Sequence, residues 1–182
     1  YEIDDDLRWL VALLSDTGMR LSEAAGLAIE DICLDHQVPH INLKPHPWRR
    51  LKTQQSERQV PLVGAALWAA QRIATGVEGQ FCFPRYTNAE SCNGNSASAA
   101  LNKWLKANFS KEGVVHGFRH SFRDRLRVVN CPTEMIEQLG GWSLANVGSR
   151  YGRGYDFKSQ RVFMDAITFS MSDGLEPTKI VT

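Results

Sequence analysis

The sequence predicts a mostly helical α+β domain with a small antiparallel β-sheet. Apolar residues recur at three- and four-residue steps in several segments, as they do along one face of a helix. Two short segments, 38–43 and 57–62, have the composition of strands and are bounded by turn residues. The chain of 182 residues has no internal repeat and is long enough to bury a full core. We therefore expect one domain spanning residues 1–182.

The N-terminal third is expected to hold one helix and then the sheet. The acidic run 4–6 favours a helix start, because carboxylates stabilise a helix N-terminus. The apolar stripe of that helix is Leu7, Leu10, Val11 and Leu14. Further on, residues 51–53 and 57–62 are expected to form the two arms of a hairpin, with the polar residues 54–56 as its loop.

The remaining two thirds are expected to be helical. Apolar spacing predicts helices at about 65–74, 97–109, 115–129, 133–139 and 160–169. Residues 88–98 are rich in Asn, Ser and Gly, and we expect them to form a mobile loop. The last predicted helix has a short apolar face that could pack on the core of its own chain.

Composition argues against several classes of protein. The four cysteines contain no CxxC pair, so neither a zinc ribbon nor a disulfide framework is indicated, and we expect free thiols. No apolar run approaches the length that spans a membrane, and no signal segment is present. These patterns predict a soluble, cytoplasmic protein. The net charge of +1 is low for a DNA-binding protein, but basic residues cluster locally around Arg49, Arg50 and Lys52.

The motif HGFR, which begins at His116 and ends at Arg119, contains a candidate phosphate-binding pair. On a helix these two residues are i,i+3 neighbours, roughly 5–6 Å apart at Cβ, so both could hold oxygens of one phosphate. Arginine suits this task because its planar fork donates two parallel hydrogen bonds and stays charged. Taken alone, however, the motif is more typical of a solvated basic face.

Other elements make the phosphate interpretation stronger. Arg20 follows a Thr-Gly turn and precedes a helix start, which would aim its guanidinium into a cleft. Lys52 lies near the tip of the predicted hairpin, from which it could swing into an active site. The motif LGGW ends at Trp142, and Tyr151 follows nine residues later.

In this order and spacing, TGMR with a following Glu, KT with ERQVPL, HGFRH, LGGW and the tyrosine resemble the catalytic domain of the tyrosine recombinase, or phage integrase, family. The resemblance covers residues 17–151, about three quarters of the chain. It implies the recombinase catalytic-domain fold, with Tyr151 as the nucleophile. It also implies the catalytic set Arg20, Lys52, His116, Arg119 and Trp142. Histidine is more usual in the family at the last of these positions, and tryptophan is an accepted alternative.

The resemblance further implies a site-specific recombinase that cleaves and rejoins DNA through a covalent 3′-phosphotyrosine, with no cofactor and no metal. A phenol is a poor nucleophile at neutral pH, so cations must stabilise its phenolate or a base must take its proton. Arg20, Arg119 and the indole N–H of Trp142 would bind the oxygens on which charge develops. Lys52 is the expected general acid for the leaving 5′-oxygen, and His116 is a phosphate ligand or an acid–base partner.

The expected partners are double-stranded DNA and further copies of the chain, as a homotetramer on DNA. Arg49, Arg50 and Arg150 are expected to contact the DNA. The resemblance also implies a phage or mobile-element source, and an N-terminal DNA-clamping domain that is absent from this chain. The C-terminal segment, about 156–182, could then pack on a neighbouring protomer instead of on its own core.

Several alternatives remain open at this level. Tyr155 is a rival nucleophile, although its spacing of thirteen residues from Trp142 fits the family less well. His116 and His120 are an i,i+4 pair that could bind zinc, but Gly117 stands where the catalytic glutamate of an HExxH helix would be. The chain could also be a type IB topoisomerase-like strand transferase, or a DNA-binding regulator without catalytic activity.

Overall fold

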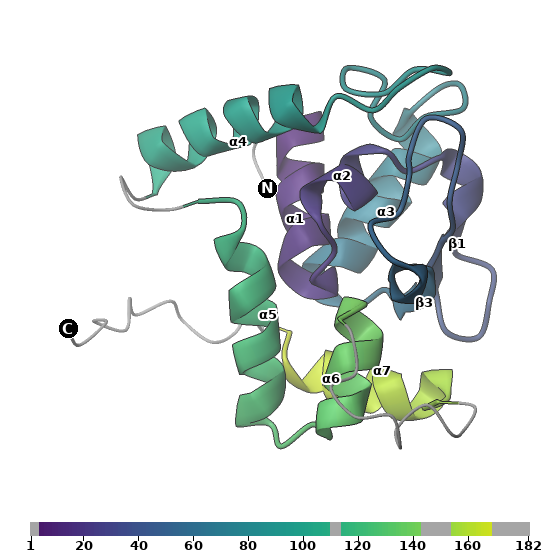
Figure 1. Cartoon of the computed structure of the whole chain (residues 1–182), viewed down its shortest axis with the longest axis vertical. Helices are drawn as coiled ribbons and strands as arrows, with labels where there is room; N and C mark the ends of the chain where they lie inside the picture. Colours follow the sequence, from purple (N-terminus) through teal and green to yellow (C-terminus); the bar gives the residue numbers. More distant parts are fainter. Residues whose placement is uncertain (1–3, 110–113, 143–153, 169–182) are drawn as a thin grey trace.

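A computed structural model describes residues 4–109, 114–142 and 154–168 of the chain. The fold is mostly helical with a small sheet, as predicted (Figure 1). Its helices are α1 (Asp6–Thr17), α2 (Leu21–Ala25), α3 (Gly64–Gly76), α4 (Gly94–Asn108), α5 (Gly117–Val128), α6 (Thr133–Gly140) and α7 (Phe157–Ala166), with short 3-10 helices η1 (Ile29–Asp31) and η2 (Gln54–Ser56). Its strands are β1 (Ile32–Cys33), β2 (His40–Leu43) and β3 (Arg58–Pro61).

The sheet corrects the predicted hairpin. Its strand order is β1-β2-β3, and both pairs are antiparallel. Strand β3 pairs with β2, where Ile41 lies opposite Val60, rather than with residues 51–53, which form no strand. Ile41 and Val60 are both fully buried. Pairing β3 with β2 therefore brings two apolar side chains into the core, whereas segment 51–53 has a single apolar residue, Leu51.

Helix α1 is the centre of the larger core. It packs against α3 and α5 (Figure 1), and it buries Leu10, Leu13 and Leu14. Its N-terminus is capped by Asp5, whose carboxylate accepts a hydrogen bond from the N–H of Arg8. It ends at Gly18, where φ is +60° and where a Cβ would overlap the ring of Phe122 on α5. Both the left-handed backbone and the close approach require glycine at this position.

A second, smaller core joins α5, α6 and α7 to β3. Phe122 and Leu126 of α5 pack there with Met164 of α7 and with Ile167, which directly follows the end of α7. Helix α7 thus packs on the core of its own chain (Figure 1). The rest of the C-terminal segment, residues 169–182, lies outside the described residues.

The predicted helices are present, with shifted ends. One shift shortens the expected loop 88–98, because α4 already begins at Gly94. The side chain of Asn93 accepts a hydrogen bond from the N–H of Ser96, so this asparagine caps the helix instead of extending the loop. Helix α2 begins directly after Arg20, where a helix start was expected, and spans five residues. Strand β1, which spans two residues, was not predicted.

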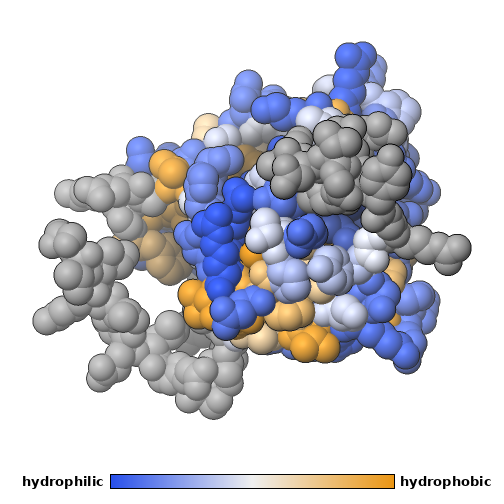
Figure 2. Space-filling view, turned by 60° about the horizontal axis from the view of Figure 1, so that its bottom comes forward, coloured by the Kyte–Doolittle hydropathy of each residue, from blue (hydrophilic) through white to orange (hydrophobic). Residues whose placement is uncertain are grey.

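The surface on the side of α5, α6 and α7 is mainly hydrophilic, and its apolar residues gather in separate small areas (Figure 2). The described helices are all too short or too polar to cross a lipid bilayer.

Candidate active site

Arg20 lies where the chain turns from α1 into α2. Gly18 ends the first helix, and Arg20 is the N-cap of the second, with an extended backbone at φ −70° and ψ 150°. Glu23, three residues on, accepts a hydrogen bond from the backbone N–H of Arg20 at 2.9 Å and forms an ion pair with its guanidinium at 2.5 Å. The turn thus fixes the direction of the chain at Arg20, as the sequence predicted. The ion pair with Glu23 holds the Arg20 side chain.

Glu23 also holds a second arginine, Arg58, at the start of β3. The Glu23 carboxylate lies 3.2 Å from Nη2 of Arg58, and both side chains are buried. Burial would raise the pKa of Glu23, but the charge of Arg58 and the hydrogen bonds from Arg20 outweigh it and hold the pKa below its ordinary value. Glu23 is therefore ionised at neutral pH and partly compensates two guanidinium groups.

Arg119 reaches the same cluster from the first turn of α5. Its Nη1 donates to the carbonyl oxygen of Gly18, which ties α5 to the end of α1. Its Nη2 is buried and has no hydrogen-bond partner among the described residues. Burial, together with the positive charges of Arg20 and Arg58, lowers the pKa of Arg119 to about 10. A group shifted in this way favours an anion close to it, because a negative charge would restore its pKa.

Trp142 covers this arginine. Its ring lies 4.2 Å from Cζ of Arg119 and 5.0 Å from Cζ of Arg123, close enough for cation–π interactions with both. The ring packs directly on Gly140, where a Cβ would overlap it, so the first glycine of LGGW makes room for the indole. The second, Gly141, has φ +61° and ends α6. The ring thus packs on α5 and α6; any contact with Tyr151 lies outside the described residues.

Of the other predicted catalytic residues, the structure describes His116 and Lys52, and both are exposed. His116 is exposed at the N-cap of α5, and its ring centroid lies 4.8 Å from that of His120 in a T-shaped contact. Lys52 is exposed in the bend before η2, the 3-10 helix that carries Ser56. Ser56 accepts a hydrogen bond from Nη1 of Arg20 at 3.0 Å, so the segment that carries Lys52 touches the arginine cluster. Tyr151 and Arg150 lie outside the described residues.

Arg49 does not occupy the surface position that was expected for a DNA contact. Only 2% of the residue is exposed, and its guanidinium pairs with Asp31 at 3.2 Å. It also donates to the carbonyl oxygens of Glu23 and Gly26, so it joins η1 to the end of α2. Its burial excludes a contact with DNA in this conformation. The neighbouring Arg50 is exposed and remains a candidate.

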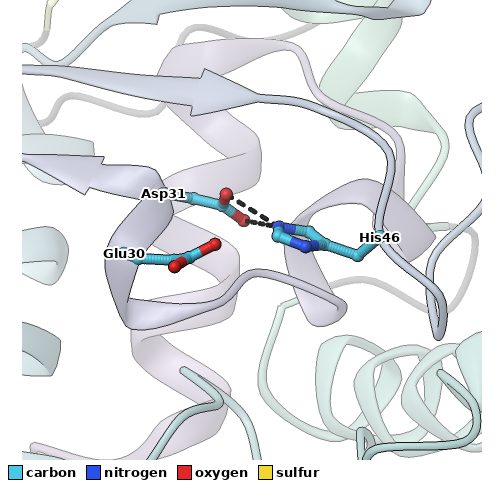
Figure 3. A group of neighbouring side chains, drawn as sticks. All are labelled: Glu30, Asp31 and His46. Atoms are coloured by element: carbon cyan, nitrogen blue, oxygen red, sulfur yellow. Dashed lines mark hydrogen bonds and ion pairs between the residues drawn. The ribbon is translucent and has the colours of Figure 1, made fainter.

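Asp31 also belongs to a group with the residue types of a metal site, together with Glu30 and His46 (Figure 3). One ligand atom from each residue lies within 4.8 Å of the others. The Asp31 carboxylate, however, already accepts hydrogen bonds from Nε2 of His46 at 2.9 Å and from the N–H of Ala28, besides pairing with Arg49. Glu30 pairs with Lys44 at 3.0 Å. These contacts support a structural role that keeps Arg49 buried.

Three buried residues of the site were not predicted as functional: Glu23, Ser56 and Arg58. Each lies inside or beside a motif that the sequence does show, since Glu23 follows Arg20 by three residues and Arg58 begins RQVPL. The sequence carries no separate signal that Arg58 is buried, because the polar Glu57 and Gln59 flank it.

The fold and the site together define a helical domain in which two arginines and a tryptophan from three motifs meet at one place. The chain matches the model of the phage integrase family over residues 3–156, and it belongs to that family. No curated protein matches the sequence.

Solved structures show the same fold. One is the integrase of the Tn1549 transposon in complex with a circular intermediate DNA, which is 19% identical with a TM-score of 0.57. That match covers 88% of this chain and 58% of the other, so this chain spans less than two thirds of the integrase structure. Another is the same integrase in complex with transposon right end DNA, which is 20% identical with a TM-score of 0.55 and covers 86% of this chain and 57% of that chain.

Proposed function

We propose that the chain is the catalytic domain of a site-specific DNA recombinase that cleaves and rejoins strands through a 3′-phosphotyrosine. The observation that carries the proposal is the cluster of the buried Arg58 and Arg119 and the partly buried Arg20 around the single carboxylate of Glu23. One carboxylate leaves this cluster with a net positive charge, and Nη2 of Arg119 has no partner among the described residues. A backbone phosphate supplies the negative charge and the acceptor oxygens that such a cluster favours.

The proposed steps follow from these positions. The two non-bridging oxygens of the scissile phosphate bind Arg20 and Arg119, and the Tyr151 oxygen attacks phosphorus while the bond to the 5′-oxygen breaks. The cations stabilise the charge that develops in the transition state. Lys52 gives a proton to the departing 5′-oxygen, and His116 serves as a phosphate ligand or takes the phenol proton. Trp142 holds Arg119 in place and donates its indole N–H. Rejoining reverses these steps, so no cofactor is needed.

We infer that the substrate is double-stranded DNA and that the protein acts as a homotetramer on it. The solved relatives are DNA complexes of a transposon integrase, which supports a mobile-element role for this chain. Arg50 and Arg150 are the proposed contacts with the DNA backbone. The same proposal includes the packing of the remaining C-terminal residues, 169–182, on a neighbouring protomer of the tetramer.

The decisive experiment is covalent capture on nicked duplexes. A pool of nicked DNA with a randomised sequence lets a cut strand leave, so the phosphotyrosine accumulates, and the captured DNA can be recovered after denaturation and sequenced. We expect the wild-type chain and the variant Tyr155→Phe to form the adduct, and Tyr151→Phe to form none while still binding DNA.

Tyr155 is a matched control because its backbone is held on α6. Its N–H donates to the Gln138 side chain at 2.9 Å, and the Gln138 amide donates back to its carbonyl oxygen at 3.1 Å. An adduct that persists in Tyr151→Phe and disappears in Tyr155→Phe would reverse the assignment. DNA binding with no adduct in the wild type would instead indicate a regulator, and relaxation of supercoiled DNA without strand exchange would indicate a topoisomerase.

A further inference from the structure

The hydroxyl group of Ser56 lies between the arginine cluster and the segment that carries Lys52. Ser56 is fully buried at the end of η2. Its Oγ accepts a hydrogen bond from Nη1 of Arg20 at 3.0 Å and another from the backbone N–H of Thr53 at 3.3 Å. It also lies 3.0 Å from the Thr53 hydroxyl. A serine hydroxyl has one donor and two acceptor positions, so these three contacts use all of its hydrogen-bonding capacity.

These contacts act on the residue next to Lys52. Thr53 follows Lys52 directly, and its carbonyl oxygen accepts a hydrogen bond from the N–H of Ser56 at 3.0 Å. One turn is therefore closed both by backbone and by side-chain hydrogen bonds. The Lys52 side chain itself is exposed. The position of its flexible stem relative to the arginine cluster thus depends on this turn.

Ser56 is in turn held from the interior. Nη1 of Arg58 donates to the carbonyl oxygen of Ser56 at 2.8 Å, and Nε of Arg58 donates to that of Leu139 at 2.8 Å. Leu139 begins the LGGW turn that ends at Trp142. The Arg58 guanidinium also packs closely on Gly141, because a Cβ added to this glycine would lie only 2.7 Å from Nη1 of Arg58. The buried Arg58 side chain therefore links the backbone of Ser56 to the LGGW turn that carries Trp142.

We propose that Ser56 is a positioning residue that sets the Lys52 ammonium relative to the phosphate bound by Arg20. This inference rests on the proposed function. A general acid must lie within hydrogen-bond reach of the atom that it protonates, and a misplacement of about 1 Å can cost about 100-fold in rate. Arg20 keeps its ion pair with Glu23 when the hydroxyl is lost. The effect of losing Ser56 should therefore fall on the proton transfer and not on the phosphate clamp.

The test compares two forms of the captured duplex, one with the normal bridging 5′-oxygen and one with sulfur in its place. A sulfur leaving group departs without a proton, so it does not need the acid. We expect Ser56→Ala to cleave the oxygen substrate about 10- to 100-fold more slowly than the wild type, and the sulfur substrate within about threefold of it. The exposed Ser96→Ala serves as the matched control and should cleave both at the wild-type rate.

A double-mutant comparison separates positioning from a general structural effect. In a Lys52→Ala background, adding Ser56→Ala should not slow the oxygen substrate further, because the group that Ser56 positions is already gone. Thr53 provides a second route if Ser56→Ala does not fold. Thr53→Ala removes the same hydroxyl contact and should slow the oxygen substrate selectively, whereas Thr53→Ser, which keeps the hydroxyl, should restore the rate.

Two results would overturn the inference while leaving the proposed function intact. One is equal slowing of Ser56→Ala on both substrates, and the other is a full additional loss in the Lys52→Ala background. A wild-type chain that forms no adduct on either substrate would remove the proposed function and this inference together.

Discussion

Replacing Glu23 with glutamine tests the electrostatics of the site most directly. Glu23 is 2% exposed, and its carboxylate accepts hydrogen bonds from the backbone and guanidinium of Arg20 and from Nη2 of Arg58. Glutamine has one acceptor oxygen, and its amide N–H groups would face guanidinium donors. The variant therefore loses hydrogen bonds and also leaves two arginines without their shared counter-charge.

Breaking a buried ion pair by removing one partner costs about 3–5 kcal/mol. Since the Arg20 side chain is 25% exposed and keeps some hydration, we expect the lower end, about 3 kcal/mol. For a chain of this size, each kcal/mol lowers the midpoint of thermal unfolding by about 2–4 °C, so the expected loss is about 6–12 °C. The assay is thermal unfolding followed by circular dichroism, with the exposed Glu90→Gln as the control, which should change stability by less than about 0.5 kcal/mol.

The dependence on pH has a definite sign. The pKa of Glu23 in the folded chain lies below its ordinary value of 4.5. The ionised carboxylate therefore contributes its full share of folding stability above pH 4.5, and this stability is lost as the pH falls through the folded pKa. The difference in stability between the wild type and Glu23→Gln should therefore shrink below about pH 4.5. A Glu23→Gln variant that melts within about 2 °C of the wild type at pH 7 would refute the reasoning, because the carboxylate would then be effectively screened.

Other predictions concern the cations, the metal and the thiols. Arg119→Ala should cut adduct formation by at least about 100-fold, whereas the exposed Arg127→Ala should leave it unchanged; equal rates on the captured duplex would remove Arg119 from the site. Excess EDTA should not slow cleavage in a single-turnover assay, and a strict requirement for Mg²⁺ or Zn²⁺ would contradict the phosphotyrosine mechanism. Burial raises the pKa of Cys131 to about 11, so its thiol should react with a disulfide reagent at pH 8 far more slowly than the partly exposed Cys92, and equal rates would show that the second core opens readily.

Sequence patterns predicted the helices well because their evidence is local. The apolar stripe of α1, the HGFR helix and the LGGW turn each lie within one short segment, and hydrophobic spacing or a glycine reports such structure directly. The order of the motifs also pointed to the family that the chain belongs to. The same resemblance predicts Arg20 and Arg119 in one site, and in the structure the charge of Arg20 acts on the Arg119 guanidinium.

Contacts between distant segments could not be predicted in the same way. Local composition made residues 51–53 look like the partner of β3, but burial of Ile41 opposite Val60 selected β2 instead. Arg49 looked like a DNA contact because it is basic, yet its ion pair with Asp31, 18 positions earlier, draws it into the interior. Charge is visible in a sequence, whereas burial depends on which elements pack together.

The family motifs, their spacing and most helix positions were thus determined by the sequence alone, since each depends on neighbours along the chain. Only the tertiary structure decided what surrounds those motifs. Arg58 contacts Leu139 across 81 positions and Glu23 across 35, and these hydrogen bonds join three motifs into one charged cluster. Such a cluster exists because burial of the surrounding apolar faces brings the segments together and leaves each buried guanidinium to find a partner inside the protein.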